Sequence, residues 1–187
     1  MRTVARRFIL RCSATVLFLL PLGAAVAGPE DSAAANRSPF LGTWELDLAR
    51  MPANYGPPPR RVLYTFEDAG KGQWRTTVDI TAPDGSVRHM AVRYARDGSA
   101  STGEGDQSEA DSAAINQPAP NVLVMSLSKN KMLGSVRVYA VSSDGKEMTE
   151  SAAATDSGGA PFVRNFHFRR LSCAGHVARD GRKTTPA

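Results

Sequence analysis

The stretch that decides the fold is Phe40-Leu41-Gly42-Thr43-Trp44-Glu45-Leu46-Asp47-Leu48. Its apolar residues and its glycine share one parity, whereas Thr43, Glu45 and Asp47 fall on the other. This period of two predicts a β-strand with one buried face. Gly42 lets another segment approach the start of the strand, and the Trp44 indole behind it has the size to plug the end of a β-barrel.

Further segments alternate between apolar and polar residues as far as residue 170. The alternation predicts strands over residues 62–67, 74–81, 89–94, 121–128, 136–140, 147–154 and 162–170. Turn sequences separate several of them, among them Asp84-Gly85, Asp97-Gly98 and Asp144-Gly145. No segment after residue 27 has a helical period long enough to compete with this all-β pattern.

The segment Ser99–Pro120 interrupts the pattern. It is rich in Ser, Ala, Gly and acidic residues and contains no Lys or Arg. We expect most of it to be mobile surface, with one weak strand around Ser112–Asn116. The total is about eight strands, or nine with the weak one. A meander of that size is predicted to close into a single up-and-down antiparallel barrel, because closure removes exposed strand edges.

The N-terminus reads as a targeting segment. A basic head with four arginines precedes an apolar run from Ala14 to Ala25, and Ala25-Val26-Ala27 offers small residues for cleavage. This pattern predicts a secretory signal peptide over residues 1–27 rather than a membrane span, and hence a periplasmic or secreted protein. The formal net charge of +5 then falls to +1, since 19 basic residues remain against 18 acidic ones. A balance near neutrality gives no case for nucleic-acid binding.

The mature chain is predicted to have three parts. Residues 28–38 form a flexible lead-in, residues 39–171 form the barrel, and residues 172–187 form a disordered tail without periodicity. Cys173 is the only cysteine after the signal peptide. It cannot make a disulfide within the chain, and pairing between chains stays open.

The ordered part resembles a family of small, exported bacterial lipocalin-like β-barrel proteins that are largely uncharacterised. The resemblance covers Phe40 to Arg170 and lies in Gly42-Thr43-Trp44-Glu45-Leu46-Asp47, Tyr94-Ala95-Arg96-Asp97-Gly98, Val141-Ser142-Ser143-Asp144-Gly145-Lys146-Glu147-Met148-Thr149 and the segment 155–170. It implies a fold and export, and no catalytic motif. It also implies that a basic side chain near the last strand, Arg164, Arg169 or Arg170, stacks on Trp44 and closes the barrel together with Gly42.

Motifs for catalysis, phosphate binding or metal ligation are lacking, so no cofactor or metal is expected. His89 and His167 lie at the outward parity of their strands, which favours a surface position. Seven aromatic residues share the inward parity: Trp44, Tyr64, Phe66, Trp74, Tyr94, Phe166 and Phe168. They either fill the core or line a lumen in which the hydroxyls of Tyr64 and Tyr94 orient a small hydrophobic or amphipathic ligand.

Three functions remain open. The first is non-catalytic binding of a small apolar or amphipathic molecule in the lumen. The second is a filled barrel that serves as an interaction module in the cell envelope, with an unidentified protein partner at the proline-rich loop 51–60 or at the acidic segment. The third, an enzyme of unknown type, ranks last because few titratable residues lie at inward positions. A barrel in the outer membrane is disfavoured, since Glu45, Asp47 and Glu67 would face lipid.

Overall fold

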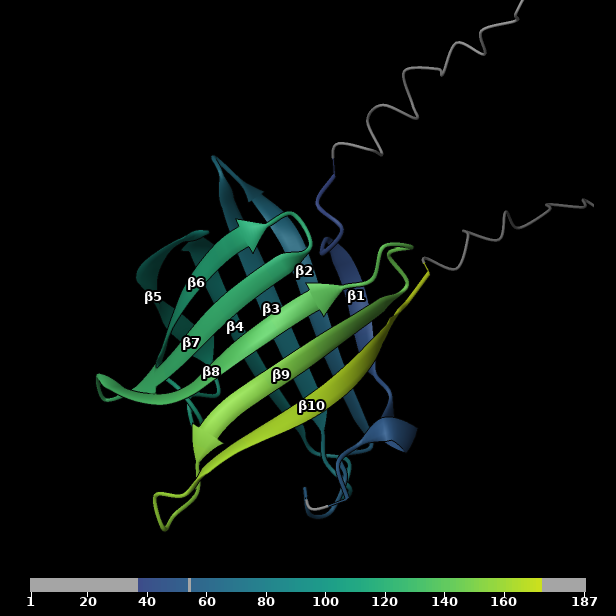
Figure 1. Cartoon of the computed structure of the whole chain (residues 1–187), viewed down its shortest axis with the longest axis vertical. Coiled ribbons are helices and arrows are strands. Elements are labelled where there is room, and N and C mark those ends of the chain that lie inside the picture. The colour runs from purple at the N-terminus through teal and green to yellow at the C-terminus, as the bar shows by residue number, and fades with distance from the viewer. Residues whose placement is uncertain (1–36, 54, 173–187) are drawn as a thin grey trace, which may run out of the picture. The chain divides into compact units, whose positions relative to one another are not determined.

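The computed structural model describes residues 37–53 and 55–172. Ten strands form a closed antiparallel barrel in which each strand pairs with the next along the chain (Figure 1). The elements are β1 (Gly42–Leu46), the 3₁₀-helix η1 (Leu48–Arg50), β2 (Arg61–Gly70), β3 (Gln73–Thr81), β4 (Val87–Ala95), β5 (Asp97–Gly105), β6 (Ser112–Ala119), β7 (Val122–Lys129), β8 (Met132–Val141), β9 (Glu147–Thr155) and β10 (Pro161–Arg170).

The first and last strands close the barrel. β1 pairs with β10 through Trp44↔Arg170, Glu45↔Arg169 and Leu46↔Phe168, and its other edge pairs with β2. The expected all-β up-and-down barrel is therefore confirmed. Among the described residues, no helix has the length and hydrophobicity that crossing a membrane requires.

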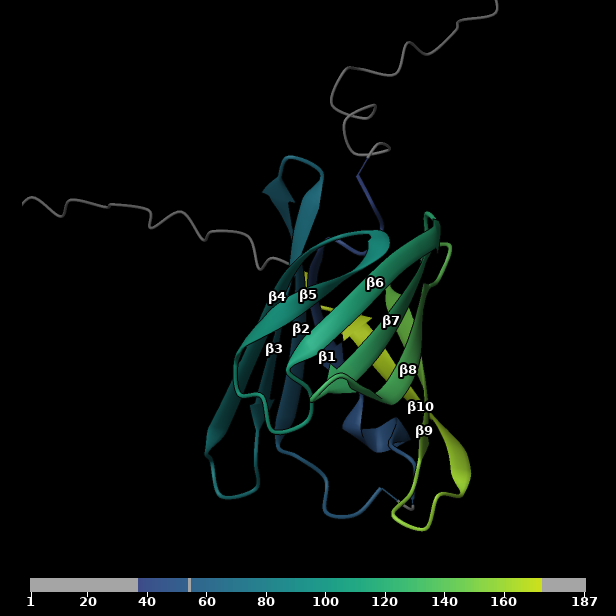
Figure 2. The same ribbon diagram turned by 90° about the vertical axis from the view of Figure 1, so that its left-hand side faces the viewer.

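The expected number of about eight strands is wrong, because the barrel has ten. The segment Ser99–Pro120, expected to be mostly mobile surface, contributes most of β5 and all of β6. Figure 2 shows these two strands completing the wall between β4 and β7. β5 has no apolar stripe, and most of its side chains are exposed. Backbone hydrogen bonds to its neighbours hold it in place, and these need no particular side chain.

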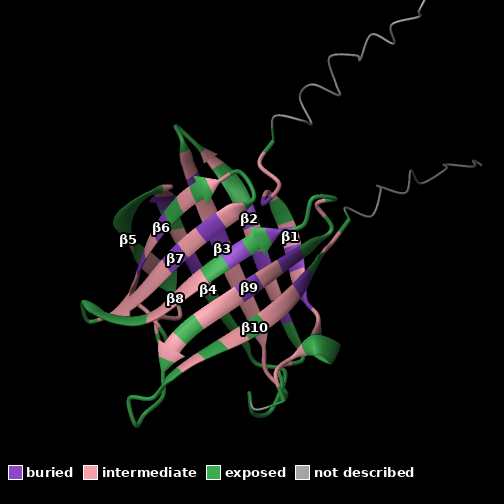
Figure 3. Cartoon of the chain, in the orientation of Figure 1, coloured by how far each residue is buried: buried purple, intermediate pink, exposed green. Residues whose placement is uncertain are grey.

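Burial alternates along the strands, as Figure 3 shows for the wall. One half of the interior is filled by a group of aromatic side chains that we call the plug: Phe40, Trp44, Phe66, Trp74 and Tyr94. All five are 3% exposed or less. Phe40 packs against the rings of Phe66 and Trp74, and the Trp44 indole Nε1 donates a hydrogen bond to the Phe40 carbonyl oxygen at 2.8 Å.

The opposite end carries the proline-rich loop 51–60 and the turns after β3, β5, β7 and β9. In Figure 2, η1 and this loop lie below the barrel at that end. The predicted signal peptide, residues 28–36 of the predicted lead-in, and Cys173 with the rest of the predicted tail lie outside the described residues. Those assignments stay predictions.

Candidate functional site

The half of the barrel below the plug contains a cavity of about 640 Å³. Its mouth lies at the proline-loop end, because Tyr55, Pro57 and Pro59 contribute to its wall together with residues from the turns after β3 and β5. Apolar side chains from many strands make most of the wall, among them Val62, Val78, Ile80, Met90, Leu127 and Phe162. A volume in this range suits a small organic molecule.

The seven aromatic residues expected to face inward divide into two groups. Trp44, Phe66, Trp74 and Tyr94 belong to the plug and do not line the cavity. Tyr64, Phe166 and Phe168 line it. Core filling and a lumen, which the sequence posed as alternatives, thus occupy opposite halves of one barrel.

The two inward tyrosines have different hydrogen-bonding roles. The Tyr94 hydroxyl lies 2.7 Å from Thr76 Oγ1, so its bond is made within the plug. Burial raises the pKa of Tyr94 to about 12, which keeps the phenol protonated at neutral pH. The Tyr64 hydroxyl lies at the cavity wall and accepts a hydrogen bond from Arg137 Nη1 at 3.3 Å. Tyr64 alone of the two offers its hydroxyl at the cavity.

A charged cluster sits inside the cavity at the level of Tyr64. Arg137 on β8 binds the carboxylate of Glu109 from the turn after β5, and its Nε lies 3.6 Å from Glu150 Oε1 on β9. The side chains of Arg137 and Glu150 are only 14% and 4% exposed. Ion pairs this deep lose most of their hydration, so each charge depends on its partner.

Burial shifts the protonation of this cluster. The pKa of Glu150 is raised above its ordinary value of 4.5, chiefly because burial disfavours the carboxylate, while the nearby Arg137 charge opposes the shift. The pKa of Tyr139, which is buried beside the cluster on β8, is raised well above its ordinary value by burial and by the Glu150 charge. Tyr139 is therefore neutral at physiological pH.

Aromatic rings and Arg164 lie together at the mouth of the cavity. Tyr55 of the proline-rich loop meets the Phe166 ring edge-on at a centroid distance of 5.5 Å. The Arg164 guanidinium lies over the Phe162 ring at 4.4 Å and near Tyr55 at 5.7 Å. Contacts of this kind hold Tyr55 of the loop against β10.

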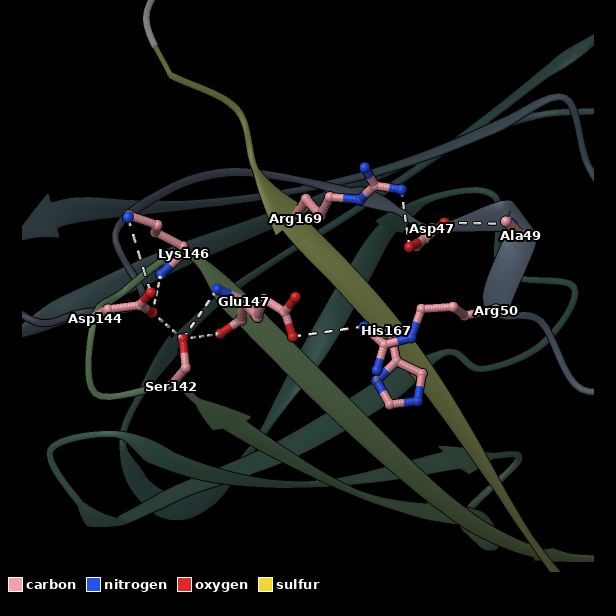
Figure 4. Close-up of polar contacts among 9 residues, drawn as sticks. All are labelled: Asp47, Ala49, Arg50, Ser142, Asp144, Lys146, Glu147, His167 and Arg169. Carbon is pink, nitrogen blue, oxygen red and sulfur yellow. Dashed lines mark hydrogen bonds and ion pairs between the residues drawn. The ribbon is translucent and has the colours of Figure 1, made fainter.

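Of the three arginines expected near the Trp44 indole, Arg170 takes that position. Its guanidinium carbon lies 4.1 Å from the ring centroid. Arg169 points to the outside and pairs with Asp47 Oδ2 at 2.9 Å (Figure 4). Arg164 lines the cavity mouth instead. Strand parity explains the separation, because Arg169 faces opposite to its neighbour and Arg164 lies six residues away along β10.

The two histidines of the described chain lie on the outer surface, as their parity predicts. His167 Nδ1 is 2.9 Å from Arg50 Nη2 in the group of polar side chains drawn in Figure 4. His89 Nδ1 is 2.6 Å from Asp79 Oδ1 on the neighbouring strand. Neither residue contributes to the cavity wall.

Sequence reasoning missed Arg137, Tyr139 and Glu150. The expectation that inward positions are poor in titratable groups is therefore wrong. On β8 the apolar residues Val136, Val138 and Ala140 share one parity, yet Val138 is 39% exposed and the opposite parity faces inward. The register with β9, where Tyr139 pairs with Glu150, puts both residues on the inner face. Arg137 shares its parity with Tyr139 and Val141, and Glu150 shares its parity with Met148. These three large residues are buried, so their positions in the sequence are the signal that locates the cluster on the inner face.

Comparisons with known proteins place the chain in no family. No protein-family model and no curated protein matches it. Similar solved structures include wild-type fluorescent protein UnaG, with 11% identity, TM-score 0.48 and coverage of 71% of this chain and 97% of that one. Zebrafish ileal bile acid-binding protein complexed with cholic acid gives 14% identity, TM-score 0.45 and coverage of 72% and 100%. Rv2717c from M. tuberculosis gives 18% identity, TM-score 0.43 and coverage of 78% and 99%.

Proposed function

We propose that this protein is exported and binds a small amphipathic molecule inside its barrel without transforming it. The cavity of about 640 Å³ is the observation that carries the proposal. Its apolar wall favours burial of a ligand's hydrocarbon surface, worth about 25 cal/mol per Å² before the costs of ordering. The few polar groups at Tyr64, Arg137 and Glu150 orient the ligand rather than supply most of its affinity.

The test is saturable binding of Nile red, a neutral fluorescent dye, to the purified protein. A matched pair of variants on β9 localises the site. Ala152 lines the cavity, and its neighbour Ala153 is exposed on the outside of the same strand. Ala152→Phe fills the cavity and is expected to weaken Nile red binding at least tenfold, whereas Ala153→Phe leaves it unchanged. Far-ultraviolet circular dichroism verifies that both variants are folded.

Two outcomes contradict the proposal. If the binding of Nile red to the wild-type protein does not saturate, the protein has no specific site for the dye in its lumen. Equal affinity in the wild type and Ala152→Phe places the dye elsewhere on the surface. The alternative of a filled barrel predicts no lumen at all, and the cavity counts against it.

Export is supported by the N-terminal sequence. Cleavage after Ala27 is expected to give a mature protein that begins at Gly28. Expression of the full chain in a Gram-negative host, followed by mass measurement of the protein in the periplasmic fraction, tests this directly. Full-length protein confined to the cytoplasm would contradict export without touching the ligand proposal.

A second candidate is an enzyme, favoured by one observation. Glu150 is a buried carboxyl with a raised pKa beside a cavity, which is the environment of a general acid. Mass spectrometry of molecules that co-purify with the wild type and with Glu150→Gln separates the two functions. An enzyme carries its substrate in the variant and a chemically different product in the wild type, whereas a binding protein carries no such substrate–product pair.

A further inference from the structure

The charge around Glu150 indicates which kind of head group the cavity accepts, provided that the proposed lumen binding is correct. Arg137 brings one positive charge, and Glu109 and Glu150 bring one negative charge each. The guanidinium is thus already matched by two carboxylates. A ligand carboxylate would have to displace Glu109 and then lie beside Glu150, and like charges in a desolvated site repel strongly.

The same region has unmet hydrogen-bonding capacity. Within residues 37–53 and 55–172, neither Arg137 Nε nor the Tyr139 hydroxyl has a hydrogen-bond partner, although both atoms are buried. The 3.6 Å between Arg137 Nε and Glu150 Oε1 suits an ion pair but is too long for a hydrogen bond. Buried polar groups are normally satisfied. The Tyr139 oxygen can accept a hydrogen bond from a ligand, whereas Arg137 Nε can only donate and calls for an acceptor.

We propose that the ligand is an amphipathic amine whose protonated nitrogen lies against Glu150 and whose apolar part extends towards the mouth. An ammonium group brings the positive charge that the two carboxylates leave unmatched, and it can donate hydrogen bonds to Glu150 and to the Tyr139 oxygen. It does not satisfy Arg137 Nε, which is itself a donor. The pKa of Glu150, raised by burial, is pulled back when a cation binds beside it. Apolar wall residues such as Val78, Ile80 and Leu127 cover the hydrocarbon part.

Arg164 is the rival position for a head group. It lines the mouth, and its Nε is buried without a hydrogen-bond partner among the described residues. It lies over aromatic rings, and no ion pair with a described carboxylate is found for it. An anionic ligand would choose this guanidinium rather than Arg137. The two positions thus predict opposite preferences for head-group charge.

The experiment measures displacement of Nile red at pH 7 by three ligands with the same ten-carbon chain: decylamine, decanol and decanoate. Decylamine is expected to bind at least tenfold more tightly than either of the others. Glu150→Gln is expected to reduce this preference to less than threefold. Glu147→Gln is the control, since Glu147 lies on the same strand as Glu150 but is exposed on the outer surface, where it pairs with Arg50 at 3.5 Å, and it leaves the preference unchanged.

The results separate this inference from the function on which it rests. If the three ligands displace Nile red with equal affinity, or if decanol binds most tightly, lumen binding stands and the amine inference is overturned. If decanoate binds most tightly and Arg164→Gln removes that higher affinity, the ligand's head group lies at Arg164, which also overturns the amine inference. A Glu150→Gln variant that keeps the full amine preference also overturns the inference, and should that variant fail to fold, the order of the three ligands on the wild type decides. Absence of Nile red binding refutes the proposed function itself.

Discussion

The Arg170 guanidinium lies 4.1 Å from the centre of the Trp44 indole and closes the barrel at the end opposite the cavity. It also donates hydrogen bonds to the backbone carbonyl oxygens of Gly145, at 2.6 Å, and of Leu41, at 2.6 Å, and to that of Pro39. One side chain therefore ties β10 to the turn before β9 and to the segment before β1. Burial lowers the pKa of this guanidinium, yet an arginine stays charged at any physiological pH.

Replacement of Arg170 by leucine is expected to lower the free energy of unfolding by about 3 kcal/mol, because charge-assisted hydrogen bonds and the contact with the indole are lost together. Urea denaturation followed by tryptophan fluorescence measures the change. Arg169→Leu is the matched control, since the Arg169 side chain is 66% exposed, lies on the outer face and makes no contact with the indole. It is expected to have little effect, and a loss equal to that of Arg170→Leu would argue against the special role of the indole contact.

The glycine at the end of β5 is expected to be essential to the ten-stranded wall. Gly105 has φ = 79°, and a Cβ there would lie 2.3 Å from the backbone oxygen of His89. Gly105→Ala should therefore break the β4–β5 pairing and destabilise the protein by about 2–3 kcal/mol. Gly103→Ala tests the same strand without the clash, since its nearest atom would lie at 3.5 Å. Thermal unfolding that ranks Gly103→Ala as the more damaging change would contradict the placement of β5.

A double-mutant cycle is expected to show strong coupling between Arg137 and Glu150. Arg137→Met leaves the buried Glu150 carboxyl without its cation and should cost about 3 kcal/mol at pH 7. Adding Glu150→Leu removes the orphaned charge, so the double variant should recover most of that loss. Chemical denaturation of the four proteins gives the coupling energy. Strictly additive losses would mean that the two side chains do not interact in solution.

Stability should depend on pH through Glu150. Its pKa in the folded protein lies above the ordinary value of 4.5, so folding favours the protonated form. That contribution is complete below about pH 4.5 and is lost as the pH rises through the folded pKa. The free energy of unfolding of the wild type relative to Glu150→Gln is therefore expected to fall as the pH rises above 4.5. Arg137, Tyr64, Tyr139 and Glu109 surround the carboxyl and remain in both proteins.

Some acidic residues have a pKa that folding lowers, and they do not obscure this measurement because they are present in both proteins. Asp84, Asp97 and Asp144 accept hydrogen bonds from nearby serine hydroxyls, which lower the pKa of each carboxyl below its ordinary value of 3.8. The stability that they add is present above about pH 4 and is lost on further acidification. A wild-type free energy of unfolding that instead rises relative to that of Glu150→Gln as the pH increases would contradict the raised pKa of Glu150.

Alternation of apolar and polar residues was sufficient to predict most of the barrel wall. The Trp44 and Phe168 segments could be read in this way because one face of each is buried by large side chains. β5 could not, since Asp97 to Gly105 offers the core almost nothing and is held by pairing along both edges. Periodicity reports buried side chains and is silent on strands fixed through the backbone alone.

The polar part of the site was hidden for a different reason. A charged residue such as Arg137 or Glu150 normally marks the outer face, and on β8 the parity opposite to Arg137, with Val136, Val138 and Ala140, is apolar enough to pass for the core. On β9 Glu150 instead shares the parity of the apolar residues Met148, Ala152 and Ala154. Only the register of β8 against β9 reveals that the two charges face each other inside. The parity of the aromatic residues did predict which side chains face the interior. It could not predict which of them belong to the plug and which line the cavity, because that depends on where along the barrel axis each ring lies.

The Arg170 guanidinium and the Leu41 carbonyl oxygen that it binds are 129 residues apart in the chain. The pairing of β1 with β10 therefore cannot form until nearly the whole domain has left the ribosome, and every earlier intermediate exposes two unpaired strand edges. The barrel therefore cannot close while the earlier strands are being made, and its two edges stay open to pairing with other chains until synthesis is almost finished.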